Sequence, residues 1–276
     1  IAEPVGSCTD LSATIMQPLK DLFPAWRVAP LSVLIDPRRV HSALRTKHPR
    51  LHEDATYILK TQLREADQIV LTKADLLAAP EREELLAYLA GEFPGARPTH
   101  LSALTGEGVD TWLESVLEDT TGGLRITAVD YERYAQGEAV LGWLNAAADL
   151  RWIGGLQADW EEFAVSFFEL LQRSFVAAAT EVGHVKLLVA CPGGRLLANL
   201  TSLEGPVKLQ VEGGLDRLTA RMTANARVQL PPQQLEQVFR GALRQAAYGR
   251  VAATMKAFHC LSPGRPVPTY RYGAVV

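Results

Sequence analysis

The sequence has 276 residues, of which 47% are hydrophobic and 21% charged, and this composition predicts a globular chain of about two domains. The formal net charge of −3 argues against a general nucleic-acid binder, and no apolar run reaches the roughly 18 residues of a membrane span. Three cysteines are too few for a disulfide framework and favour a reducing, cytoplasmic environment, so we expect neither nucleic-acid nor membrane partners.

The first 120 residues alternate short apolar runs with segments of helical periodicity. The pattern predicts strands at 31–35, 68–71 and 99–102, and helices at 53–67, 80–91 and 109–117. Because the apolar runs are continuous rather than alternating, the strands are expected in a parallel sheet covered on both faces. Residues 1–120 are therefore predicted to form a doubly wound α/β domain, whose ligands lie at the carboxyl ends of the strands.

The pattern of predicted helices and strands changes after the small residues at 120–123, where we place the domain boundary. Residues 125–276 contain a predicted helix from 160, a hairpin at 184–200, strands at 207–211 and 218–230, and a helix at 233–248. This order predicts a two-layer α/β sandwich with an antiparallel sheet.

Arg221 and Arg227 fall on the polar face of the long strand at 218–230. We expect that face to be solvated, with docking of an acidic partner or a phosphate as the alternative.

Two predicted strands are followed by residues that suit a guanine base. Asp75 comes after the second strand, in a Thr-Lys-Ala-Asp run, and a Ser-Ala-Leu run follows the third. A carboxylate there can accept hydrogen bonds from the ring N–H and the exocyclic amine of guanine, while a lysine stem covers the purine. Backbone N–H groups of the Ser-Ala loop can reach the base carbonyl. An ordinary capping loop is the alternative interpretation. The residues assigned to guanine are Thr72, Lys73, Asp75, Ser102, Ala103 and Leu104.

Residues 66–77 closely resemble the guanine-specificity segment of the CobW/UreG/HypB group of P-loop GTPases, which are SIMIBI-class metallochaperones and cobalamin-synthesis-type proteins. The Ser102–Leu104 run is similar to the second guanine loop of this family, and the resemblance extends over residues 1–118. Glu3-Pro-Val-Gly6 is similar to the Glu-x-x-Gly at the end of the Walker B strand. The resemblance implies that Glu3 helps to organise Mg²⁺ and that the Gly6 N–H faces the γ-phosphate of GTP, which makes both residues catalytic candidates.

The sequence departs from this family in two respects. Residues 125–276 do not match the common carboxy-terminal domain of the family, and no Gly-x-x-x-x-Gly-Lys-Ser/Thr motif occurs in the 276 residues. The chain begins at Ile1 rather than Met, so we expect an amino-terminal truncation before the Walker B strand. The alternative is a degenerate homologue whose partner supplies phosphate binding, or which binds no nucleotide. Since the P-loop provides most of the grip on phosphate and Mg²⁺, we expect no appreciable GTPase activity and at best weak guanine binding.

Candidate metal ligands are few. Cys8 follows the Glu-x-x-Gly motif and is the candidate for a transition metal such as Zn²⁺ or Co²⁺, although a small buried side chain is the favoured interpretation. Asp10 is expected to cap a helix at 11–19. His48 and His52 have i, i+4 spacing, but Pro49 between them argues against a helix and hence against a metal site.

Two functions are compatible with these residues. In the first, the complete protein is a GTPase in which GTP and Mg²⁺ hold residues 3–10, and hydrolysis releases them to pass metal or cofactor to a client metalloprotein or cofactor-dependent protein. A homodimer is compatible with this function. In the second, the chain is a non-catalytic protein-binding module on a degenerate GTPase scaffold.

Overall fold

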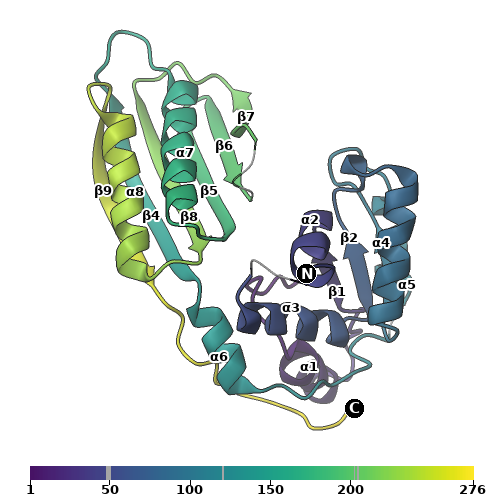
Figure 1. The fold of residues 1–276 in the computed structure, drawn as a ribbon. Helices are drawn as coiled ribbons and strands as arrows, with labels where there is room; N and C mark the ends of the chain where they lie inside the picture. The colour runs from purple at the N-terminus through teal and green to yellow at the C-terminus, as the bar shows by residue number, and fades with distance from the viewer. Residues whose placement is uncertain (48–50, 120, 202, 204) are drawn as a thin grey trace. The chain divides into compact units, whose positions relative to one another are not determined.

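The structure, a computed structural model, describes residues 1–47, 51–119, 121–201, 203 and 205–276. The chain divides into two compact units, one made of residues 1–137 together with 265–276 and the other of residues 138–264 (Figure 1). Residues 125–137 and 265–276 therefore belong to the first unit, whereas the sequence placed both in the second domain. Each helix in the described part of the chain is too short or too polar to traverse a lipid bilayer.

The first unit is built on a three-stranded parallel sheet in the order β1-β2-β3, and the predicted parallel fold is confirmed. The strands are β1 (Ser32–Ile35), β2 (Gln68–Leu71) and β3 (Arg97–His100). The register pairs Ile35 with Leu71 and Leu71 with His100, so the carboxyl ends of the three strands lie at one edge. Every residue of the central strand β2 is buried, as its continuous apolar run predicts.

The helices of this unit follow the predicted order. They are α1 (Gln17–Leu22), α2 (Pro37–Arg39), α3 (Glu53–Glu65), α4 (Ala79–Glu92), α5 (Val109–Glu118) and α6 (Tyr131–Ala139), with π-helical turns at Ser12–Met16 and Val40–Leu44 and a 3₁₀ turn at Ala74–Leu76. The third strand ends two residues before its predicted end. Leu101 still donates to the Leu71 carbonyl at 3.0 Å, but Ser102 already donates to Glu107 within the following loop, at 2.8 Å.

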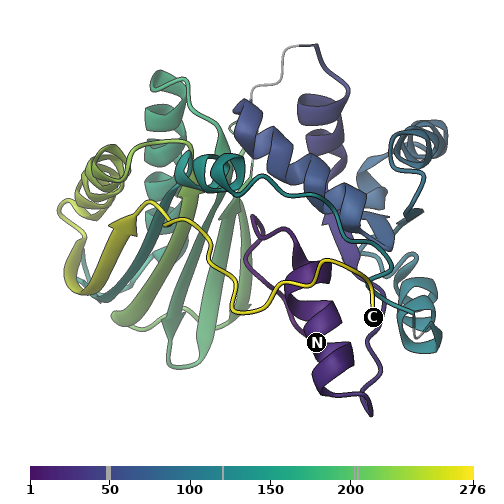
Figure 2. The ribbon, with the colours of Figure 1, turned by 90° about the horizontal axis from the view of Figure 1, so that it is seen from below.

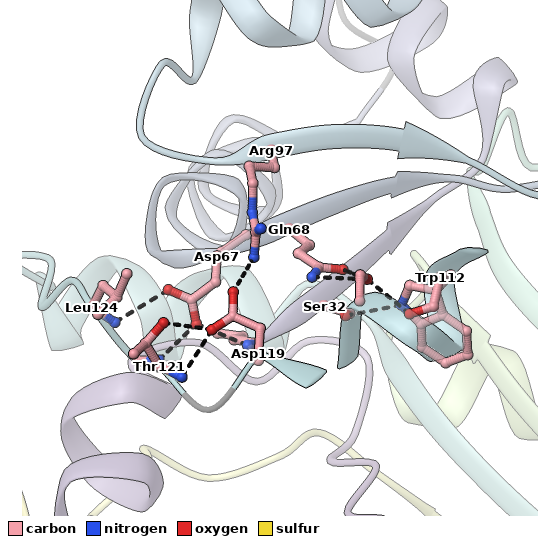
Figure 3. Close-up of polar contacts among 12 residues, drawn as sticks. Ser32, Asp67, Gln68, Arg97, Trp112, Asp119, Thr121 and Leu124 are labelled. Carbon is pink, nitrogen blue, oxygen red and sulfur yellow. Dashed lines mark hydrogen bonds and ion pairs between the residues drawn. The ribbon is translucent and has the colours of Figure 1, made fainter. Parts of the chain in front are cut away.

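Asp67, at the opposite end of the sheet, anchors the segment that leaves α5. Its carboxylate accepts backbone N–H groups from Leu31 at 2.8 Å, Gly123 at 2.6 Å and Leu124 at 3.1 Å. Asp119 in turn accepts from Arg97 at 2.6 Å and from the Thr121 N–H at 3.0 Å (Figure 3). These bonds tie the described residues of the predicted boundary at 120–123 to the starts of β2 and β3, because a carboxylate can satisfy several backbone donors at once.

The second unit contains a six-stranded antiparallel sheet in the order β7-β6-β5-β8-β4-β9. Its elements are β4 (Gly142–Trp152), α7 (Trp160–Ala177), β5 (Val182–Cys191), β6 (Gly194–Leu200), β7 (Lys208–Gly213), β8 (Thr219–Val228), α8 (Pro232–Ala247) and β9 (Val251–Leu261). Without the β6–β7 hairpin, the order β4-α7-β5-β8-α8-β9 is the βαββαβ arrangement of ferredoxin-like folds. The predicted α/β sandwich is confirmed, with α7 and α8 side by side on one face of the sheet (Figure 2).

The core of this unit lies between the sheet and the two helices. Asp159 caps α7 by accepting the Glu162 N–H at 2.8 Å, as its capping-box spacing predicts. The aromatic residues of α7 are fully buried; they include Trp160, Phe163, Phe167, Phe168 and Phe175. The strands β4 and β9 were not predicted. Residues 146–148, in the middle of β4, are all alanine. The buried and the more exposed positions therefore have the same hydrophobicity there, and the sequence shows no strand-like alternation.

Candidate functional site

The carboxyl edge of the parallel sheet joins Asp75 to Ser102. Oδ1 of Asp75 accepts the Ser102 hydroxyl at 2.5 Å, and the Ala74 N–H donates to the Leu101 carbonyl at 3.1 Å. Ser102 is fully buried, whereas Asp75 is exposed. Among the described residues, no donor reaches Oδ2 of Asp75. A buried hydroxyl therefore fixes one oxygen of an exposed carboxylate and leaves the other able to accept a hydrogen bond.

Lys73 lies beside this carboxylate and is held by the end of β1. Its Nζ is 2.5 Å from Oδ2 of Asp36, whose Oδ1 caps α2 by accepting the Arg38 N–H at 2.8 Å. The backbone of Lys73 has a φ of 55°, a left-handed conformation that is uncommon for a residue with a side chain. Thr72 donates to the Ile35 carbonyl through both its N–H, at 2.9 Å, and its hydroxyl, at 3.1 Å. The turn after β2 is thus tied to β1 on one side and to β3 on the other.

The loop after β3 exposes residues 103–107 to solvent. Ser102 anchors it, because its carbonyl accepts the Gly106 N–H at 2.9 Å and its hydroxyl accepts the Thr105 N–H at 3.2 Å. Ala103 and Leu104 are exposed, and in the described part of the chain their N–H groups make no hydrogen bond. Gly108 closes the loop with a φ of 74°, and a Cβ there would lie 2.4 Å from the His100 carbonyl oxygen, so only glycine fits.

The residues predicted to act on phosphate lie in an irregular segment. The expected Walker B strand is not formed: residues 1–5 have no strand structure, because a strand needs a neighbour to bond to and the described strands of this unit pair only with one another. Gln62 holds the segment by donating to the carbonyl oxygens of Gly6 at 2.9 Å and Cys8 at 2.7 Å. Within the described ranges, no hydrogen bond or ion pair connects Glu3 or Gly6 with the guanine candidates.

Asp10 does not cap a helix, contrary to expectation. Its φ is 65° and its side chain turns to other partners: Oδ2 accepts from Arg271 Nε at 2.6 Å and from the Tyr131 hydroxyl at 2.7 Å. Only 1% of Asp10 is exposed. Burial and the hydrogen bond to Asp10 raise the pKa of Tyr131 to about 12. Sequence analysis missed Arg271, since no local pattern connects residues so far apart.

Glu65 is a second buried carboxylate near residues 9–12 that sequence analysis missed. Its oxygens accept the Thr9 hydroxyl at 2.9 Å and the Ser12 N–H at 3.4 Å. Burial raises the pKa of Glu65 to about 7, more than these hydrogen bonds lower it. One signal could have found it: Glu65 lies seven residues after Ile58, a buried residue of α3, and therefore on the buried face of the helix.

The described residues do not assemble a metal centre. They contain no group of three or more His, Cys, Asp or Glu side chains placed to hold an ion. His52 caps α3 by accepting the Asp54 N–H at 3.2 Å, and His48, its suggested partner, lies outside the described residues. The three cysteines form no disulfide with one another. Cys8 therefore stands as a single candidate ligand outside any such group.

Comparisons with known proteins give two structural similarities. No family model matches the chain, and no curated protein matches it. The Zn(II)-bound YjiA GTPase from E. coli is 17% identical with a TM-score of 0.26, over 82% of this chain and 67% of that one. A Zn(II)-bound triple mutant of the YjiA GTPase is 18% identical, with the same TM-score and coverage. Similarity at this level assigns no family, so a functional assignment depends on the residues of the site itself.

Proposed function

We propose that the first unit recognises the guanine base of a nucleotide and that the Asp75 carboxylate determines this specificity. The hydrogen bond between Asp75 and the buried Ser102 carries the proposal, because it fixes a carboxylate at the sheet edge where α/β folds bind ligands. Guanine presents two adjacent donors, its ring N–H and its exocyclic amine, to such a carboxylate. Adenine lacks this donor pair.

The neighbours of Asp75 fit the rest of the base. The Lys73 stem, held by its ion pair with Asp36, offers methylene groups to a purine face. The N–H groups of Ala103 and Leu104 are available to the carbonyl oxygen of the base. Adenine carries an amine where guanine carries this carbonyl, so the two N–H groups would have no acceptor. Both edges of the base therefore contribute to discrimination.

The finer function within this proposal is a GTP-binding protein of the CobW/UreG/HypB type that delivers a metal or cofactor to a client protein. It is supported by the resemblance of residues 66–77 and 102–104 to that family. The residues for phosphate and Mg²⁺ do not fit: Glu3 is exposed, residues 1–5 form no strand, and no P-loop motif occurs in the sequence. We therefore derive no hydrolytic step and no metal transfer for this chain.

Amide chemical shifts test the base assignment directly. In ¹⁵N-labelled protein titrated to millimolar GMP, the amides of residues 73–75 and 102–104 should shift, and equal AMP should leave them unchanged. Asp75→Ala should abolish the GMP response, whereas Asp110→Ala, an exposed carboxylate in the first turn of α5, should preserve it. Equal shifts with GMP and AMP, or an unchanged GMP response in Asp75→Ala, would contradict the proposal.

A further inference from the structure

The sheet of the second unit has one face without a covering layer. The helices α7 and α8 pack on the other face, and β8 alternates strictly between buried and more exposed positions along its length (Figure 2). In the described part of this unit, no helix or strand lies over the second face. Because directly paired residues of antiparallel strands project to the same side, the register identifies which residues share it.

Basic residues outnumber acidic ones on this uncovered face. The basic residues are Arg151, Lys186, Arg195, Lys208, Arg221, Arg227 and Lys256, and the acidic residues are Asp149 and Glu212. Both acids already have partners. Glu212 binds Arg195 at 2.6 Å, and Asp149 lies 3.1 Å from Lys256 and 3.9 Å from Arg221. Within the described residues, Arg151, Lys186, Lys208 and Arg227 have no carboxylate partner, so the face has an uncompensated positive charge.

Two unused donors lie together at one end of this face. The Arg227 guanidinium stacks 4.1 Å over the Trp143 ring, and its Nη1 donates to the Ala226 carbonyl at 2.9 Å. The Nε of Arg227 and the Nε1 of Trp143 are buried, yet neither has an acceptor in the described structure. A buried donor without a partner is costly, so a movement of the Arg227 side chain that brought an acceptor to these donors would be favourable.

Polar residues surround these donors, and Lys186, paired with Asn225 across the strands, adds positive charge. His184 is paired with Arg227 across the strands, and its ring Nε2 lies 2.7 Å from the Asn225 side-chain oxygen. Burial, together with the charges of Lys186 and Arg227, lowers the pKa of His184. Asn225 is also bonded to Asn145. The site therefore offers donors and positive charge to an anion, and no nearby carboxylate competes among the residues that the structure describes.

We propose that this face docks an acidic segment of a partner protein, with Arg227 and Lys186 receiving its carboxylates. A nucleic acid fits less well, because sheet faces that bind single strands stack bases on exposed aromatic rings, and here Arg227 covers the Trp143 ring.

The other end of the face offers a second contact. A hollow of about 610 Å³ there is lined by residues that include Arg151, Arg221 and Asp149, whose carboxylate is already paired with Lys256. Trp143 and Arg151 both belong to β4, and at about 3.3 Å per residue an extended segment of about eight residues would span the distance between them. The proposal concerns the second unit alone and does not depend on nucleotide binding.

Fluorescence anisotropy with the full chain tests this surface. The probe is a fluorescein-labelled dodecapeptide of alternating Glu and Ser, compared with its Lys counterpart and with a labelled dodecauridylate, at low salt. Arg227→Gln should weaken binding of the Glu peptide about tenfold, since a charge-assisted hydrogen bond is lost. Lys186→Gln, at an exposed position where folding is not at risk, should weaken it about threefold.

The matched controls are Arg173→Gln on α7 and Arg244→Gln on α8, which make the same change of charge at exposed positions on the helices. Both should stay within about twofold of the wild type, because exposed charges on the helices, away from the sheet face, contribute little to binding there. The proposal is overturned if the controls lose as much affinity as the sheet variants, if dodecauridylate binds more tightly than the Glu peptide, or if the Glu peptide does not bind.

Discussion

The Ser102 hydroxyl donates a 2.5 Å hydrogen bond to the Asp75 carboxylate, and this bond joins the loop after β3 to the turn after β2. The two residues follow neighbouring parallel strands, so their meeting is a direct consequence of the sheet topology. Ser102 is fully buried and Asp75 is exposed, which separates the positioning group from the group that contacts a ligand. This relationship is the basis of the guanine assignment.

Removal of the Ser102 hydroxyl should cost both stability and recognition. In Ser102→Ala, Asp75 loses its donor and the Thr105 N–H loses its acceptor, so we expect the free energy of unfolding to fall by about 1–2 kcal/mol. The GMP-induced shifts at residues 73–75 should also shrink. Urea denaturation and the same titration measure both effects; wild-type values for both would show that the hydroxyl does not position Asp75.

The closing glycine of the loop offers a matched pair of variants. In Gly108→Ala, the new Cβ would lie 2.4 Å from the His100 carbonyl oxygen at a φ of 74°, so the loop must move. In Gly106→Ala, φ is 84° but no atom lies within 4 Å of the new Cβ. We expect a loss of about 1 kcal/mol for Gly106→Ala from backbone strain alone, and at least about 2 kcal/mol for Gly108→Ala. Similar losses for the two variants in urea denaturation would contradict the steric role of Gly108.

Glu65 should make stability fall as the pH rises. Its pKa is about 7 in the folded protein against an ordinary value of 4.5, so the folded state binds the proton more tightly than the unfolded state does. The stabilisation is fully present below about pH 4.5 and is lost as the pH rises through 7. At 1.36 kcal/mol per pKa unit, the loss between pH 4.5 and pH 8 approaches about 3 kcal/mol. Urea denaturation across this range should show the dependence in the wild type and a flatter one in Glu65→Gln; equal slopes would contradict it.

The Asp10–Arg271 pair should stabilise the helical segment that follows Asp10. Arg271→Ala leaves the buried Asp10 carboxylate without its guanidinium, and we expect a loss of about 3 kcal/mol. Asp10→Asn combined with Arg271→Ala should lose less than the sum of the two single variants, because the two side chains are coupled. Hydrogen exchange should rise over residues 9–22 in Arg271→Ala and remain unchanged in β2. Additive losses would show that the pair does not act as a unit.

Local patterns in the sequence predict the helices and strands in which the hydrophobicity of residues differs clearly from that of their neighbours. The uninterrupted apolar residues at 69–71 predict β2, and the alternation from 218 to 230 predicts β8. The same reasoning misses β4 and β9, since their alanines give no contrast between the two faces. The guanine candidates come together because topology places the ends of parallel strands at one edge. The Asp10–Arg271 pair could not be predicted, as it joins residues 261 positions apart through tertiary packing alone.

A change of the side chain at position 75, matched by a change of the base, tests the central claim most directly. Xanthine carries an oxygen where guanine carries its exocyclic amine, so an amide side chain at position 75 can donate to xanthine, whereas a carboxylate cannot. Titrations of ¹⁵N-labelled wild type and Asp75→Asn with GMP and XMP should show inverted preferences, with GMP favoured by the wild type and XMP by the variant. A wild type that responds equally to both nucleotides, or a variant that keeps the preference for GMP, would contradict the assignment of Asp75 to guanine.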